Sequence, residues 1–230
     1  MNKALAKGFV TTIENNQRIH HFGFNEVQED FFCFLTLCWG VENFGSFFGG
    51  DAVADVDVDA SDAWRDGYEG AGVVVGVLDT GLAATHPDIE ANVWTNSAEI
   101  ANGRDDDGNG FIDDVAGWDF ANNDNDPDDD HFHGTHVAGT IAAVRGNNHG
   151  IIGVAPQAQI LALKVLDEDG FGSFVSVIEA IDYAIVLKRS GVPIRVLNAS
   201  LGGTEGSALL EQTLRRAGNN DILFLSLIHI

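Results

Sequence analysis

Three histidines and one aspartate stand out as residues that can move a proton. The segment HFHGTHVAGT, residues 131–140, holds all three histidines within six positions: His131, His133 and His136. Asp79 closes the apolar run VVVGVLD, residues 73–79. A neutral imidazole is a general base near neutral pH, and a carboxylate on its other ring nitrogen fixes the tautomer that such a reaction needs. Taken alone, Asp79 is also typical of a turn or a helix cap.

These residues stand at the ends of elements that alternate between strand and helix. Apolar runs predict buried parallel strands at 73–79, 158–166, 194–201 and 221–227. Helical patterns lie at 133–144, 173–191 and 207–218, with a short helix near residue 60 and a polar loop over 90–131. The alternation predicts an α/β fold, a three-layer parallel sheet with helices on both faces. Ligands of such sheets gather at the carboxyl ends of the strands, where Asp79 stands.

The composition excludes some classes of partner. The 230 residues include 12 Lys and Arg against 35 Asp and Glu, a formal net charge of −23. A chain this acidic repels nucleic acid and anionic membrane surfaces, and it attracts cations. The sequence has no run of 18 apolar residues and no apolar stretch of signal-peptide length near its start. Cys33 and Cys38 lack the CxxC spacing of zinc and redox sites, so a local disulfide and two buried thiols both stay open.

Three motifs, in this order, resemble those of one enzyme family. They are DTG at 79–81 with HPD just beyond, HGTHVAGT at 133–140 and NASLGG at 198–203. Together they are similar to the motifs of the subtilisin-like serine proteases, the subtilases, over roughly residues 39–225. The resemblance implies a serine endopeptidase that acts on polypeptides, with Asp79 as the orienting carboxylate and His133 as the base.

Two neighbours of the base need comment. The resemblance makes His136 a structural neighbour, whereas a zinc site on His133 and His136 is the alternative; the HExxH pattern typical of such zinc sites is absent. Phe132 is a departure, because the family usually has glycine just before the catalytic histidine. If that backbone needs a conformation that only glycine adopts easily, phenylalanine strains it by on the order of 1–3 kcal/mol.

The same resemblance implies how a substrate binds. An extended peptide pairs with two enzyme segments as an added strand, and glycines let its backbone come close. The matching positions are Gly170, Phe171 and Gly172 in one segment, Phe174 as the lid of an apolar subsite, and Ser200, Leu201 and Gly202 in the other. Without the catalytic motifs, each of these glycines is typical of a simple turn.

The loop before the histidines is a candidate calcium site. Residues 105–130 hold eleven aspartates and no Lys or Arg, a density of charge that is costly without a cation. Oxygen donors follow positions 1, 3, 5, 7 and 9 of a calcium loop at Asp105, Asp107, Asn109, the Phe111 carbonyl and Asp113. Position 12 is Ala116, so the loop is not an EF-hand, and Asp113 or Asp114 would complete the site. A solvated acidic loop is the alternative.

The resemblance implies two further calcium sites. The first lies in the segment just before the base, and its ligands would be Asp119, Asn122, Asp124, Asp126 and Asp128. The second would use Asp88 of the HPD motif with Asn147. Because the loop around Asn147 differs in length by one residue from the family pattern, Asn148 is an alternative to Asn147.

The motif that carries the nucleophile is absent from these 230 residues. The family's serine lies in GTSMAxP and its oxyanion asparagine in an AAGN-like segment, and neither occurs. We therefore expect a serine endopeptidase present as an inactive fragment, with residues 36–230 as the N-terminal part of the catalytic domain and 226–230 as non-native sequence. Residues 1–35 are interpreted as an N-terminal segment, either a propeptide remnant or poorly ordered. A calcium-binding, catalytically inactive subtilase-like module is the alternative. By family and acidity we expect an extracellular protein that is a monomer when complete.

Overall fold

The central sheet is parallel throughout. The computed structural model describes residues 57–203 and 207–226, and the sheet within them has the strand order β2-β3-β1-β4-β5. The strands are β1 Val74–Asp79, β2 Gly117–Asp119, β3 Gln159–Lys164, β4 Ile194–Ala199 and β5 Leu223–Ser226. Every pairing is parallel, so the carboxyl ends of the strands meet at one edge. At that edge Asp79 is in register with Lys164, and Lys164 with Asp119.

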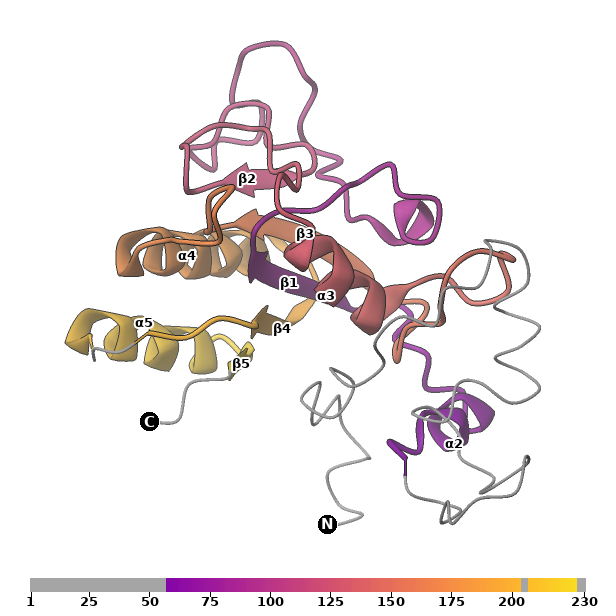
Figure 1. Cartoon of the computed structure of the whole chain (residues 1–230). Helices are drawn as coiled ribbons and strands as arrows, with labels where there is room; N and C mark the ends of the chain where they lie inside the picture. The colour runs from indigo at the N-terminus through magenta and orange to yellow at the C-terminus, as the bar shows by residue number, and fades with distance from the viewer. Residues whose placement is uncertain (1–56, 204–206, 227–230) are drawn as a thin grey trace.

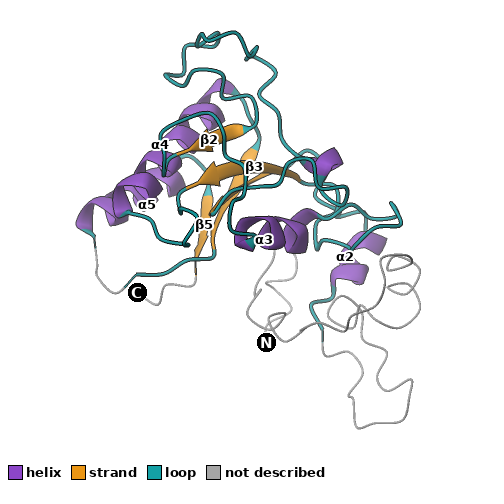
Figure 2. Ribbon diagram, turned by 45° about the horizontal axis from the view of Figure 1, so that its top comes forward, coloured by secondary structure: helices purple, strands orange, loops and turns teal. Residues whose placement is uncertain are grey.

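Helices cover both faces of the sheet, as Figures 1 and 2 show. The helix α3 (His133–Ala142) packs on one face, and α4 (Phe174–Ser190) and α5 (Ala208–Gly218) pack on the other. Alternate residues of β1 face opposite ways: Val74 and Leu78 join the cluster under α4 and α5, while Val75 and Val77 join the cluster under α3. The predicted three-layer α/β fold is therefore confirmed.

A capping box and a glycine set the two ends of α4, the helix that begins at the candidate site residue Phe174. Ser173 begins α4 with a capping box, because its Oγ accepts from the Ser176 backbone N–H while Ser176 Oγ accepts from the Ser173 N–H. Gly191, with φ +112°, ends the same helix. The cap fixes where the chain leaves the carboxyl end of β3 and turns into α4, and so it fixes the position of Phe174.

The polar stretch 90–131 contains two short elements that the sequence pattern does not reveal. They are the 3₁₀ helix η3 (Glu90–Asn92) and the strand β2, which pairs with β3. Three residues are too few to show an alternating pattern, and β2 exists because β3 offers a partner. Gly117 permits the pairing, since its φ is +112° and an added Cβ would lie 2.0 Å from the Ala162 carbonyl oxygen. The long loop between η3 and β2 projects beyond β2, the outermost strand on that side of the sheet (Figure 1).

The remaining expectations agree with the structure or lie outside it. The helix near residue 60 is α2 (Ala60–Arg65), and the other predicted helices and strands begin and end within three residues of their predicted bounds. Cys33, Cys38, the segment 1–35 and the last four residues lie outside the described residues. Across the described ranges, the helices are too short or too polar to cross a membrane.

Candidate active site

Asp79 and His133 meet at the carboxyl end of the sheet. Asp79 is the last residue of β1 and is fully buried, and His133 is the first residue of α3 with 37% of its side chain exposed. His133 Nδ1 lies 2.7 Å from Asp79 Oδ1, a hydrogen-bonding distance. The same oxygen accepts from the Thr80 backbone N–H at 2.8 Å. The two residues are 54 positions apart in the chain, so only the fold brings them together.

This geometry prepares His133 to act as a base. The hydrogen bond to Asp79 raises the pKa of His133 above 6.5; burial opposes the rise, and the negative charges of Asp79 and Asp129 add to it. When the Nδ1–H is hydrogen-bonded to the Asp79 carboxylate, the free electron pair lies on Nε2, and the carboxylate stabilises the imidazolium that forms when Nε2 takes a proton. The pair can therefore accept a proton from a nucleophile, but neither of its two residues is that nucleophile.

A single carboxylate organises the loop that leads into His133. Asp129 Oδ1 accepts from the backbone N–H groups of His131 and Phe132, and Asp129 Oδ2 accepts from the Thr135 N–H at 2.8 Å. The Thr80 hydroxyl donates to Asp129 at 2.8 Å and accepts from the Gly134 N–H at 2.9 Å. Hydrogen bonds, chiefly those from Thr135, outweigh the effect of burial and hold the pKa of Asp129 below 3.8, so this carboxyl stays ionised. These bonds satisfy N–H groups at the start of α3 that have no partner within the helix.

Phe132 adopts a left-handed backbone conformation, which glycine adopts more easily than phenylalanine. It is the residue just before α3, with φ +92° and ψ −27°, and 72% of it is exposed. Its ring stacks on that of His131, with the centroids 4.6 Å apart. A positive φ at a bulky residue is strained, by about 1–3 kcal/mol. The Asp129 carboxylate, which accepts the Phe132 N–H, offsets part of that cost.

Replacing Phe132 separates backbone strain from ring packing. We expect the free energy of unfolding to be about 1 kcal/mol higher for Phe132→Gly than for Phe132→Ala. Glycine relieves the strain at positive φ, and alanine does not. Both variants lose the ring stack, so the comparison cancels it. Urea unfolding followed by circular dichroism measures the difference. A Phe132→Ala variant as stable as Phe132→Gly would mean that this backbone carries no strain.

The other two histidines of the motif do not form a cluster with His133. His131 lies beside Gly170, since a Cβ on that glycine would be 3.6 Å from His131 Nε2. His136 is exposed on α3, and its N–H continues the helix by donating to the Phe132 carbonyl. Within the described ranges, no group of three or more histidine, cysteine and carboxylate ligands that includes His133 or His136 is close enough to hold one metal ion.

The two segments expected to hold a substrate flank the Asp79–His133 pair. Residues 170–172 follow β3 and residues 200–202 follow β4, and β1 lies between these two strands. Phe174 spans the gap, because its ring tip would be 3.5 Å from a Cβ placed on Gly203. Phe171 is 73% exposed, and Gly170 makes a turn at φ +78°. An added Cβ at Gly172 would lie 2.2 Å from the Val165 carbonyl, so glycine is required by this chain's own packing.

Comparison with known proteins accounts for this arrangement. Residues 70–226 match the model of the subtilase family of peptidases. The chain belongs to the subtilase family. It is 38% identical over 162 residues to thermitase of Thermoactinomyces vulgaris, covering 70% of this chain and 48% of that protein. It is 36% identical over 151 residues to subtilisin-like protease 1 of Plasmodium berghei, covering 65% of this chain and 24% of that protein.

A third relative is similar to the chain over a comparable length. The thermostable alkaline protease of Halalkalibacterium halodurans is 38% identical over 168 residues, covering 73% of this chain and 38% of that protein. The chain thus spans about half or less of the length of the relatives that it matches. Family membership accounts for the parallel sheet and the helices on its two faces.

The acidic loop of this subtilase domain gathers three carboxylates. Oxygens of Glu99, Asp105 and Asp107 all lie within 4.8 Å of one another. Glu99 is buried, 6% exposed, and it accepts from the backbone N–H groups of Asp106 and Asp107 through Oε1. Hard oxygen donors at this spacing fit calcium, and the mutual repulsion of three carboxylates favours a cation among them. The 1, 3, 5, 7, 9 spacing does not include Glu99, which stands six residues before Asp105 without any pattern to mark it.

Asp113 and Asp114, the two residues expected to complete that calcium site, have different hydrogen-bond partners in the structure. Asp113 accepts from the backbone N–H groups of Asn102 and Gly103, at 2.8–3.0 Å. Asp114 is fully buried; it accepts from Tyr183 Oη at 2.5 Å, and its pKa is raised, chiefly by burial. Asn109 donates to both Asp107 and Asp114. Asp114 therefore anchors the loop to α4 through Tyr183, and Phe111 adds an edge contact with the Tyr183 ring at 4.7 Å between centroids.

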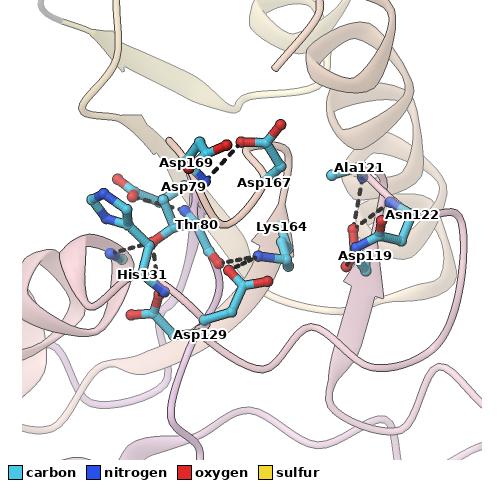
Figure 3. A network of polar contacts seen from close by, with 12 residues as sticks. Asp79, Thr80, Asp119, Ala121, Asn122, Asp129, His131, Lys164, Asp167 and Asp169 are labelled. Atoms are coloured by element: carbon cyan, nitrogen blue, oxygen red, sulfur yellow. Dashed lines mark hydrogen bonds and ion pairs between the residues drawn. The ribbon is translucent and has the colours of Figure 1, made fainter. Parts of the chain in front are cut away.

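The two other candidate calcium sites are less compact. Asp119 accepts from the N–H groups of Ala121 and Asn122, a turn that Figure 3 shows apart from the Thr80 network. Asp124 is bridged to Asp119 through the backbone, while the carboxylates of Asp119, Asp124, Asp126 and Asp128 are not grouped as closely as those around Glu99 in the described part of the chain. Asp88 is buried and does meet Asn147, whose Nδ2 donates to it at 2.9 Å. Asn148 has a positive φ of +61°.

Proposed function

We propose that this chain carries the acid–base part of a serine endopeptidase site, with Asp79 as the orienting carboxylate and His133 as the general base. The observation that carries the proposal is the 2.7 Å contact between His133 Nδ1 and a fully buried Asp79 at the carboxyl end of the sheet of a subtilase domain. Two residues of the right types, 54 positions apart, meet where ligands of parallel sheets bind.

The proposed mechanism requires the His133 tautomer with hydrogen on Nδ1, because the Asp79 carboxylate can only accept in this 2.7 Å hydrogen bond. His133 keeps its Nδ1 proton, which is hydrogen-bonded to Asp79, and accepts the proton of a serine hydroxyl at Nε2 as the hydroxyl oxygen attacks a peptide carbonyl. The imidazolium then returns the proton to the leaving amine. During both steps the negative charges of Asp79 and Asp129 stabilise the protonated ring.

The substrate of the proposed enzyme is a polypeptide in extended conformation. Its backbone would add as a strand between residues 170–172 and 200–202, with Phe174 closing an apolar subsite. The exposed Phe171 and the flanking positions of the two segments around β1 support this placement. A preference for apolar side chains near the scissile bond follows from the ring of Phe174.

Calcium is the cofactor that the domain is proposed to use. The side chains of Glu99, Asp105 and Asp107, with Asn109 and the Phe111 carbonyl, would hold one ion in the acidic loop; its role there is to neutralise the carboxylates and fix the loop. Asp88 with Asn147, and the Asp119 to Asp128 segment, are the secondary candidates. By its family and its net charge of −23, we also propose an extracellular location.

We propose that residues 1–230 alone do not include the nucleophile. No GTSMAxP segment occurs in the sequence, and Ser207 is occupied as the cap of α5, where its Oγ accepts from the Leu210 N–H. The nucleotide sequence beyond codon 225 tests the proposal. An in-frame GTSMA-like segment there would support the endopeptidase. A reading frame without one would favour the other candidate function, a calcium-binding subtilase module that does no chemistry.

A further inference from the structure

A lysine is buried between the two chain segments that carry Asp79 and His133. Lys164, the last residue of β3, has 1% of its side chain exposed. Its Nζ donates to the Thr80 carbonyl at 2.6 Å and to Asp130 Oδ1 at 2.6 Å. Figure 3 shows Lys164 beside Thr80. A buried ammonium is costly unless it is paired and hydrogen-bonded, so this position demands both partners.

Both partners belong to irregular segments next to the proposed catalytic residues. Thr80 directly follows Asp79, and Asp130 stands three residues before His133. The Thr80 hydroxyl and Asp129 already link the two segments to each other. Lys164 adds a link from a third element, the rigid strand β3, whose register places it directly opposite Asp79.

We propose that Lys164 is a positioning residue for the Asp79–His133 pair: its ammonium fixes the turn after Asp79 and the loop before His133 to the end of β3. The proposal rests on the proposed function, since it assigns Lys164 a task in that site. Lys164 does not contact the His133 ring. It acts through the Thr80 carbonyl and the Asp130 carboxylate, both of which it holds by charge-assisted hydrogen bonds.

Positioning and simple charge effects predict opposite results. If Lys164 acted only through its charge, its removal would leave less positive potential near His133 and raise the pKa of that imidazole. If Lys164 positions the pair, its removal loosens the His133–Asp79 hydrogen bond, and the pKa of His133 moves down toward 6.5. The proton on Nδ1 would also exchange with water about tenfold faster, which corresponds to roughly 1.4 kcal/mol of lost hydrogen-bond free energy.

Asp130 offers a matched pair of variants at an exposed site. Its side chain is 41% exposed, so changing it removes a partner of Lys164 without opening a cavity in the core. Asp130→Asn and Asp130→Ala both remove the charge, but only asparagine retains an oxygen that can accept from Lys164. We expect Asp130→Ala to speed exchange of the Nδ1 proton and Asp130→Asn to leave it near the unchanged protein. Lys164→Met, which removes the donor itself, should give the largest effect.

Proton NMR of the His133 ring in the 230-residue chain and the three variants tests the proposal, with backbone amide spectra as the check on folding. Faster exchange in Asp130→Ala than in Asp130→Asn supports positioning. Equal exchange in both Asp130 variants, or a pKa of His133 that rises in Lys164→Met, would overturn it. If the unchanged chain itself shows an ordinary His133 titration and no protected Nδ1 proton, the proposed function fails instead.

Discussion

Residues 1–230, purified and assayed with a fluorogenic peptide, are expected to show no hydrolysis above that of the His133→Ala variant. The pair of Asp79 and His133 has no hydroxyl to activate in a GTSMA context. In subtilisin-type enzymes the loss of the serine alone lowers turnover by about 10⁶-fold, and what remains comes from the oxyanion hole and substrate binding. The expected rate of peptide hydrolysis is therefore the rate measured in buffer without protein.

A serine-reactive phosphonate provides the control for this assay. An active subtilase at the same concentration shows that the peptide and the reagent both work. Turnover by the chain that the phosphonate blocks would contradict the account and would mean that a serine such as Ser200 or Ser207 is the nucleophile. Ser200→Ala and Ser207→Ala would then test these two. Both hydroxyls already have partners, since Ser200 Oγ accepts from Asn198 Nδ2 and Ser207 Oγ caps α5.

Calcium is expected to stabilise the domain, and Glu99→Gln to remove most of that gain. An ion that binds only the folded state adds about 2.7 kcal/mol at a concentration one hundred times its dissociation constant. For a domain of this size that is a rise in melting temperature of roughly 5–10 °C. Glu99→Gln keeps the shape of the buried side chain but removes one of the three charges grouped with Asp105 and Asp107.

Melting curves in chelator and in millimolar calcium measure the gain for each variant. Glu179→Gln, an exposed carboxylate on α4, is the matched control and should keep the full calcium shift. A residual shift in Glu99→Gln would belong to the Asp88 or Asp119 candidates. If calcium changes neither the melting temperature nor the resistance to added protease, the acidic loop is only a solvated loop.

The sequence predicts the parts of this molecule that depend on local patterns. Continuous apolar runs mark β1, β3 and β4 because strands buried on both faces need them. The Asp79 and His133 motifs mark the ends of elements, and the parallel sheet then places them at one edge.

Residues without a local pattern could not be predicted. β2 exists only through pairing with β3. Glu99 lies outside the spacing of the calcium loop, and its role depends on folding back so that its carboxylate meets Asp105 and Asp107. Lys164 is the one polar residue of the stretch 160–166, and nothing near it in the chain indicates that its ammonium reaches Thr80 and Asp130. These contacts join segments far apart in sequence.

The pH dependence of the Asp79–His133 pair has a definite sign. The pKa of His133 is raised in the folded state above 6.5, mainly by the hydrogen bond to Asp79. The pair therefore contributes its full stability below the unfolded pKa, and this contribution is lost as the pH rises through the folded pKa. Asp79→Asn removes the carboxylate that is the main cause of the raised pKa, while the charge of Asp129 stays, so it should remove most of this dependence.

The central claim is that Asp79 holds His133 as a base, and the titration of the His133 ring by NMR tests it most directly. The measurement needs no nucleophile and no substrate, and it compares the 230-residue chain with Asp79→Asn; His136, exposed on the same helix, serves as the internal reference. The account predicts that His133 titrates above 6.5 in the unchanged chain and that its pKa falls in Asp79→Asn. A His133 that titrates alike in both proteins would contradict it.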